Sequence, residues 1–147
     1  FEIGVHSNTP PHMPKLSREK MKTELTACAD TISKTIGVKP DLFRPPFGDY
    51  SDALLEVAEE CGFYTIQWDV DSLDWKGISS EEIAARVLKK TQNGSIILMH
   101  NDGKNTVKAL PAIIAGLQAK GYEFVTIGEL IYRDNFTVRN DGTQIRS

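Results

Sequence analysis

The chain has 147 residues, of which 40% are hydrophobic and 25% charged, and its formal net charge is −3. This composition is typical of one soluble globular domain or part of one. The acidic balance argues against nucleic acid as a partner, because it provides no basic surface for phosphates. No apolar run approaches the roughly 20 residues that a membrane-spanning helix needs. Cys28 and Cys61 fall in predicted helices and are expected to be buried free thiols, although a disulfide stays open.

The hydrophobic pattern predicts strands and helices in alternation. In chain order they are a strand at 3–6, a helix from Ser17 to Gly37, a strand at 42–44, a helix at 51–61, a strand at 63–70, a helix from Ser79 to Thr91, a strand at 95–99, a helix at 107–120, a strand at 122–126 and a short helix at 127–132. The polar stretch beyond Arg133 is expected to be disordered or an extension. Strict alternation predicts parallel βαβ units and therefore an α/β fold.

Polar side chains follow several of the predicted strands, namely His6, Arg44, Asp71 with Asp74, and His100. In barrels of parallel strands, residues at the carboxyl ends of the strands build the active site. A carboxylate beside an imidazole fixes its tautomer and raises its pKa, so Asp74 would suit His100 to give a proton to a leaving amine. The alternative is a histidine that ends a buried strand and donates to a backbone carbonyl.

Three further features suggest a binding site. The stretch 44–48 reads Arg-Pro-Pro-Phe-Gly and is a stiff turn, on which an amide N–H could donate to a developing oxyanion. Trp75 is either part of the core or a flat platform for a sugar ring. His6 and His12 lie on one loop and could bind zinc, although chance pairs of histidines on loops are common.

These stretches resemble, in order and rough spacing, four motifs of the polysaccharide deacetylases, the carbohydrate esterase family 4 that is built on the NodB homology domain. The resemblance runs from Ile3 to Ile131. This segment is similar in particular to bacterial members that act on peptidoglycan or are associated with sporulation. It implies a distorted parallel (β/α)7 barrel lacking its N-terminal strand or strands. Residues 1–132 would be the C-terminal portion of the deacetylase domain, and residues 133–147 a polar tail.

The resemblance also implies roles for the residues on the N-terminal side. The family's His-Ser/Thr-x-x-His-Pro motif supplies two metal ligands, and here His6 matches the first of them. Pro10 stands at the position of the second, and His12, two residues further on, is at best a substitute. Arg44 would pair with the catalytic base, and the backbone N–H of Phe47 would belong to the oxyanion hole.

On the C-terminal side, the resemblance implies that Asp74 tunes the general acid His100. Trp75 would line the sugar pocket, and Leu98 would form a hydrophobic wall for the acetyl methyl group. The implied activity is a metal-dependent hydrolase, with zinc as the expected divalent metal, that removes acetyl groups from N-acetylglucosamine or N-acetylmuramic acid units. The partner would be peptidoglycan or a chitin-like polysaccharide, and the location extracytoplasmic in a bacterium.

The family's Thr-Phe-Asp-Asp motif, which carries the base and a third metal ligand, is absent from the sequence. We therefore expect a missing N-terminal segment, in another chain or cleaved from this one, or a swapped chain. One alternative is a catalytically inactive glycan-binding relative or an incomplete fragment of such an enzyme. Another is a relative that acts on a different C–N bond, such as that of a cyclic amide or ureide.

Overall fold

The computed structural model describes residues 1–9 and 11–147. The chain divides into two compact units: a first unit of residues 1–67 and 131–147, and a second unit of residues 68–130. Each unit contains one pair of parallel strands joined through a helix, so the predicted βαβ arrangement occurs in both.

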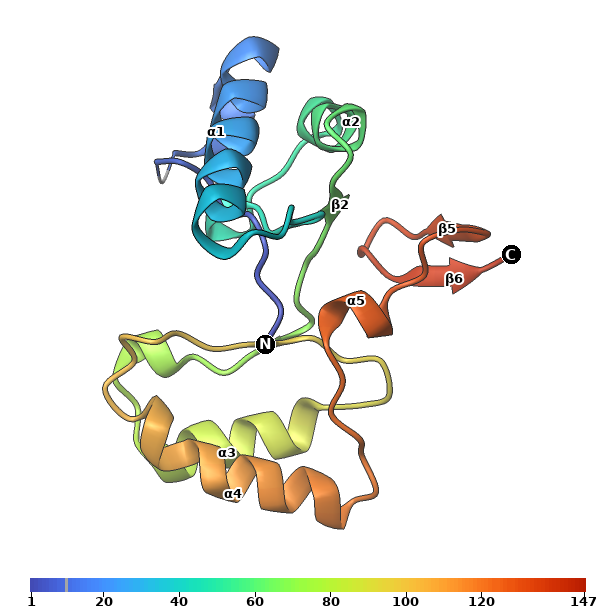
Figure 1. The fold of residues 1–147 in the computed structure, drawn as a ribbon. Helices are drawn as coiled ribbons and strands as arrows, with labels where there is room; N and C mark the ends of the chain where they lie inside the picture. Colours follow the sequence, from blue (N-terminus) through green and yellow to red (C-terminus); the bar gives the residue numbers. More distant parts are fainter. Residues whose placement is uncertain (10) are drawn as a thin grey trace. The chain divides into compact units, whose positions relative to one another are not determined.

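The first unit places helices against a short parallel strand pair (Figure 1). Its elements are η1 (Met13–Lys15), α1 (Arg18–Ile36), β1 (Leu42–Phe43), η2 (Pro46–Gly48), α2 (Asp52–Glu60), β2 (Tyr64–Thr65) and the antiparallel hairpin β5 (Phe136–Val138) and β6 (Gln144–Arg146). Strand β1 pairs with β2, with Leu42 opposite Tyr64. The buried core of this unit includes Val5, Leu25, Phe43 and Leu54.

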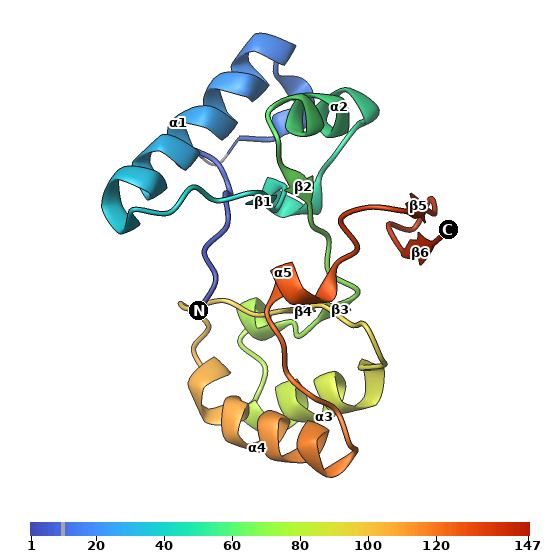
Figure 2. The same ribbon diagram turned by 45° about the vertical axis from the view of Figure 1, so that its right-hand side comes forward.

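The second unit packs two helices against a second parallel pair. Its elements are β3 (Val70–Asp71), η3 (Asp74–Lys76), α3 (Ser80–Lys90), β4 (Ile97–Leu98), α4 (Thr106–Ala119) and α5 (Ile127–Leu130). Figures 1 and 2 show α3 and α4 running side by side. Val70, Ile83, Val87, Ile113 and Leu117 form the core between these helices and β3.

The helix ends follow from the capping residues that the sequence offers. The side chain of Ser17 accepts from the amide of Lys20 at the start of α1, and Gly37 ends this helix in the left-handed region at φ 74°. Ser79 and Glu82 form a capping box at the start of α3. The predicted boundaries of these two helices are therefore confirmed.

Three predicted strands differ from the structure. Residues 3–6 make only an isolated bridge between Val5 and Phe43. Residues 63–70 form two separate strands, because the amide of Ile66 donates to Phe43 whereas that of Asp69 donates to Ile96. The predicted strand at 122–126 was wrong. Its last residue, Thr126, instead receives the amide of Glu129 on its hydroxyl and donates its own amide to the Glu129 carboxylate at the start of α5.

The polar segment after Arg133 forms the β5–β6 hairpin, so of the two expected alternatives disorder was wrong, and an ordered extension agrees with the structure. Periodicity gave no signal for it, because the strands are only three residues long and contain no fully buried residue. The boundary at residue 132 stays a prediction. Cys28 and Cys61 are free thiols, partly buried against the first unit's core. None of the described helices is long and apolar enough to cross a membrane.

Candidate active site

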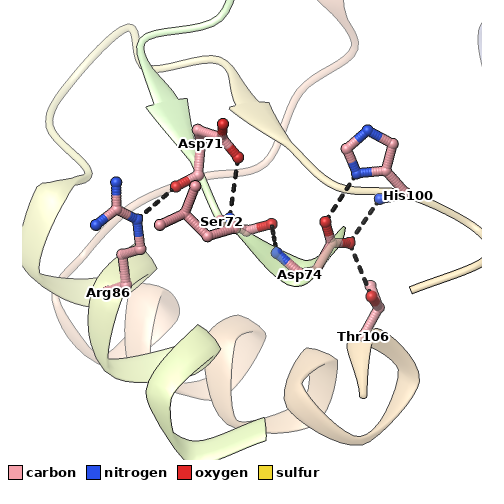
Figure 3. A network of polar contacts seen from close by, with 7 residues as sticks. Asp71, Ser72, Asp74, Arg86, His100 and Thr106 are labelled. Atoms are coloured by element: carbon pink, nitrogen blue, oxygen red, sulfur yellow. Dashed lines mark hydrogen bonds and ion pairs between the residues drawn. The ribbon is translucent and has the colours of Figure 1, made fainter. Parts of the chain in front are cut away.

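Asp74 and His100 are in direct contact in the second unit. Parallel pairing of Asp71 with Leu98 aligns the carboxyl ends of β3 and β4, and both residues follow those ends. Nδ1 of His100 lies 2.8 Å from Oδ1 of Asp74, and the His100 amide donates to Oδ2 at 2.7 Å (Figure 3). The structure therefore has the contact that the strand-end argument predicted.

The geometry fixes the protonation of both side chains. The Asp74 side chain is buried, and burial alone would raise its pKa, but hydrogen bonds from the His100 side chain, the His100 amide and the Thr106 hydroxyl together hold the pKa below its ordinary value. Because the ionised carboxylate can only accept, Nδ1 of His100 carries a proton. The remaining ring nitrogen, Nε2, is then the atom that can exchange a proton with a substrate.

The turn that carries Asp74 is built by its own polar side chains (Figure 3). The Asp71 carboxylate accepts from the Leu73 amide at 2.9 Å, and the Ser72 hydroxyl accepts from the Asp74 amide at 3.3 Å. These bonds accompany a left-handed conformation at Leu73, with φ 57°, which is unusual for a residue with a side chain. Nε of Arg86 donates to the Asp71 carbonyl at 2.7 Å and ties the turn to α3. Strain of this kind is often found at functional sites.

Trp75 follows Asp74 directly and is 56% exposed, so the alternative of a core tryptophan was wrong. The ammonium of Lys76 lies 5.1 Å from the centre of the Trp75 ring. Leu98 is buried in β4, two residues before His100. The predicted roles of Trp75 as a sugar platform and of Leu98 as a hydrophobic wall stay predictions.

In the first unit, the structure brings His6 and Arg44 together through the backbone. Nδ1 of His6 lies 2.7 Å from the Arg44 carbonyl, and the Arg44 amide donates to Val5 at 2.9 Å. A carbonyl only accepts, so Nδ1 of His6 carries a proton. In the neutral form of the ring, the lone pair is therefore on Nε2. Burial lowers the pKa of the Arg44 guanidinium, which is half-buried. Its predicted pairing with a catalytic base stays a prediction.

Phe47 and His12 form an exposed stacked pair. Their ring centroids are 4.4 Å apart and their planes differ by 18°. Nδ1 of His12 also lies 3.2 Å from Oδ2 of Asp49. Phe47 adopts φ 61°, which turns the backbone sharply within η2. The amides of Gly48 and Asp49 donate to the carbonyls of Pro45 and Pro46, respectively. The role of the Phe47 amide as an oxyanion donor stays a prediction.

The donor set for a metal is only partly present. The bond from His6 Nδ1 to a backbone carbonyl is the arrangement that orients a metal-ligating histidine, so His6 fits one ligand position. Across residues 1–9 and 11–147, however, no group of three or more histidine, cysteine or acidic side chains could hold a metal ion. Pro10, which stands at the predicted second ligand position, lies outside the described residues. The described side chains therefore do not make a complete metal site.

Comparisons with known proteins agree with this arrangement. Residues 1–66 match the family model described as polysaccharide deacetylase. A family 4 carbohydrate esterase from Streptomyces lividans is 38% identical, with a TM-score of 0.78, over 82% of this chain and 62% of its own. A CE4 family pseudoenzyme from Bacillus anthracis is 34% identical, with a TM-score of 0.85, over 88% of this chain and 46% of its own. The peptidoglycan-N-acetylglucosamine deacetylase of Bacillus cereus is 33% identical over 85% of this chain.

The chain thus belongs to the polysaccharide deacetylases of carbohydrate esterase family 4. The predicted parallel (β/α) barrel fold of this family is confirmed by the solved neighbours. The chain spans 47% of the length of the Bacillus cereus relative and 40% of a Bacillus subtilis relative called YlxY.

Sequence reasoning missed the residues that hold Asp74 in place. Thr106 donates to Oδ2 of Asp74 at 2.8 Å from the start of α4, and Gly103 lies close to both side chains. No motif marks them, because Thr106 reads as an ordinary residue in the first turn of a helix. The contact joins positions that are 32 residues apart, and only the folded structure reveals it.

Proposed function

We propose that this chain carries the acid-catalysis part of a hydrolase that removes acetyl groups from N-acetylglucosamine or N-acetylmuramic acid units of peptidoglycan or a chitin-like polysaccharide. The observation that carries the proposal is the bond between buried Asp74 and His100, and exposed Trp75 directly follows Asp74 in the chain. The names of relatives support the substrate class, since the Bacillus cereus protein is a peptidoglycan-N-acetylglucosamine deacetylase.

The chemistry assigned to these residues is the departure of the sugar amine. Water adds to the acetamide carbonyl, the C–N bond of the resulting tetrahedral species breaks, and the nitrogen takes a proton as it leaves. Imidazolium Nε2 of His100 supplies that proton, while the Asp74 carboxylate keeps Nδ1 protonated and stabilises the charged ring. The products are acetate and a free amine on the sugar. Trp75 would hold the pyranose ring against its exposed face.

A divalent metal, with zinc as the preferred ion, belongs to the same proposal. His6 would be one ligand, because the bond from its Nδ1 to the Arg44 carbonyl orients the ring as in metal-ligating histidines. Further ligands and the general base would come from a segment outside these 147 residues, or from a second copy of the protein. We assign no step to the metal, because the described side chains do not complete its site. The substrate class leads us to propose an extracytoplasmic location in a bacterium.

The test is acetate release from N-acetylglucosamine oligomers and from peptidoglycan fragments, with added zinc and with chelator. We expect zinc-dependent release that His100→Ala abolishes. The matched control is Asn101→Ala, which changes the exposed residue next to His100 and should leave release unchanged. Equal acetate release by His100→Ala and the unchanged protein would remove His100 from the acid role.

A second candidate is an inactive relative that still binds glycan. The presence of Pro10 at the second ligand position favours it, and so does the similarity to a pseudoenzyme. In this case no acetate is released, while titration calorimetry still detects oligosaccharide binding that Trp75→Ala weakens. Pro10→His should then tighten zinc binding; unchanged zinc affinity would show that the loop is aligned in the wrong register.

A further inference from the structure

The two oxygens of the Asp74 carboxylate have different partners. Oδ1 contacts Nδ1 of His100 at 2.8 Å. Oδ2 accepts from the His100 amide at 2.7 Å and from the Thr106 hydroxyl at 2.8 Å. Since only Oδ1 contacts the imidazole, proton transfer by His100 depends on the carboxylate keeping this orientation.

Thr106 is a buried polar residue whose position the helix itself does not explain. It is 6% exposed and begins α4 directly after Asn105, the N-cap residue. The Asn105 side chain makes no capping bond and instead donates to the Ile78 carbonyl at 2.9 Å, which ties the start of α4 to the segment after η3. The Thr106 hydroxyl points to Asp74, as Figure 3 shows. Because the carboxylate can only accept, the hydroxyl is the donor.

Gly103 makes room for this contact. A Cβ atom at Gly103 would lie 2.0 Å from the Thr106 hydroxyl oxygen and 2.9 Å from Oδ2 of Asp74. Such distances do not occur between real atoms, so any side chain here would push the hydroxyl and the carboxylate apart. The Gly103 backbone is outside the left-handed region, so the constraint is the close approach and not the backbone conformation. The Gly103 amide donates to the His100 carbonyl at 3.3 Å, and the Thr106 amide donates to Gly103 at 3.2 Å.

We propose that Thr106, with the space left by Gly103, is a positioning residue that holds the Asp74 carboxylate so that Oδ1 faces the imidazole of His100. This inference rests on the proposed acid role of His100. Without the hydroxyl, Oδ2 keeps only the backbone amide of His100, and the carboxylate can rotate about its Cβ–Cγ bond. The bond to Nδ1 then lengthens or is lost part of the time.

The charged neighbours do not offer another explanation for the state of Asp74. Within the described residues, His100 is the titratable side chain that contacts its carboxylate. The other charged groups on the surrounding elements are Asp71 of β3, Lys76 of η3, Glu81, Glu82, Arg86, Lys89 and Lys90 of α3, Asp102 and Lys104 of the loop before α4, and Lys108 of α4. None of these makes a hydrogen bond or ion pair with Asp74 or His100 in the part of the chain that the structure describes.

The test compares Thr106→Val, which keeps the shape and removes the hydroxyl, with Thr106→Ser, which keeps the hydroxyl. Carbon NMR of the carboxyl group measures the pKa of Asp74, and proton NMR detects the Nδ1–H resonance of His100. We expect Thr106→Val to raise the Asp74 pKa toward its ordinary value and to broaden or shift the Nδ1–H resonance. Thr106→Ser should restore both. Where the chain releases acetate, kcat should fall roughly ten- to one-hundred-fold in Thr106→Val, the rate equivalent of one hydrogen bond to a charged group, with KM unchanged.

Thr91→Val is the matched control. The Thr91 hydroxyl donates to the Val87 carbonyl at 2.8 Å in the same unit, so the control removes one threonine hydroxyl bond without touching Asp74. Gly103→Ala provides an independent variant and should reproduce the effects of Thr106→Val. An Asp74 pKa and an Nδ1–H signal that stay unchanged in folded Thr106→Val would overturn the proposal. Both NMR measurements can be made on an inactive chain, so a failed deacetylase assay would refute the proposed function without deciding this inference.

Discussion

Replacing Asp74 by asparagine tests the electrostatics of the site through stability. The carboxylate accepts three hydrogen bonds, two on Oδ2 and one on Oδ1. Asparagine keeps one acceptor oxygen, which can serve the two donors at Oδ2. Its amide group then faces Nδ1 of His100, so two donors oppose each other unless the ring moves its proton to Nε2.

The expected magnitude follows from the strengths of these bonds. Hydrogen bonds to a charged group contribute about 1.5–3 kcal/mol each, and neutral ones about 0.5–1.5 kcal/mol. Two bonds therefore weaken and the third is lost or reversed, while the cost of burying a charge disappears. We expect Asp74→Asn to lower the free energy of unfolding by about 2–4 kcal/mol at pH 7.

The pH dependence has a definite sign. The pKa of Asp74 is lower in the folded protein than in the unfolded chain. The stability that ionised Asp74 contributes is therefore full above the ordinary aspartate pKa of about 3.9 and is lost as the pH falls through the folded value. The difference in unfolding free energy between the unchanged protein and Asp74→Asn should therefore shrink as the pH falls below about 4.

The measurement is urea unfolding followed by circular dichroism at pH 7, pH 5 and pH 3.5. Asp102→Asn is the control, because Asp102 is an exposed aspartate in the loop that follows His100. Its stability should differ little from that of the unchanged protein at any of these pH values. A difference for Asp74→Asn that is absent at pH 7, or that fails to shrink between pH 5 and pH 3.5, would refute this account of the site.

Three further sets of substitutions test the fold. Leu54→Ala, in the core of the first unit, should lower the free energy of unfolding by about 2–5 kcal/mol, whereas Val107→Ala on an exposed face should change it by less than about 0.5 kcal/mol in urea titrations. Ser79→Ala should lower the free energy of unfolding by about 1 kcal/mol. Adding Glu82→Ala to it should lower this free energy little further, because both side chains belong to one capping box, and additive losses would contradict this. Phe47→Gly should be about 1 kcal/mol more stable than Phe47→Ala by thermal unfolding, because φ of 61° is left-handed and is unfavourable for a residue with a Cβ atom. The reverse order would show that the backbone at this position does not keep the left-handed conformation.

The helices were predictable because their end signals are local. Ser17 and Gly37 bound α1, and Ser79 begins α3, as single residues whose side chains or backbone freedom act on the nearest turn. The contact between Asp74 and His100 was predictable for another reason. Both follow strands, and parallel strands carry their carboxyl ends to the same edge.

Other features depend on partners that the sequence does not show. The stretch 63–70 is apolar enough for one strand, but its partner changes after Ile66. Residues 122–126 have strand-like composition but no strand partner within residues 1–9 and 11–147, and Thr126 instead forms hydrogen bonds with Glu129. The role of Thr106 depends on a contact with Asp74 that local pattern cannot predict. Strand pairing and buried polar contacts are tertiary properties, so propensity decides them poorly.

The path of the chain through the first unit has a consequence for biosynthesis. Residues 131–147 join residues 1–67 through Arg133, which forms an ion pair with Asp41 and lies 5.0 Å from the centre of the Tyr64 ring. A ribosome releases residues 68–130, which have a hydrophobic core of their own, before it releases Arg133. The nascent first unit must therefore wait, with Asp41 and Tyr64 uncovered, until synthesis has passed the whole second unit.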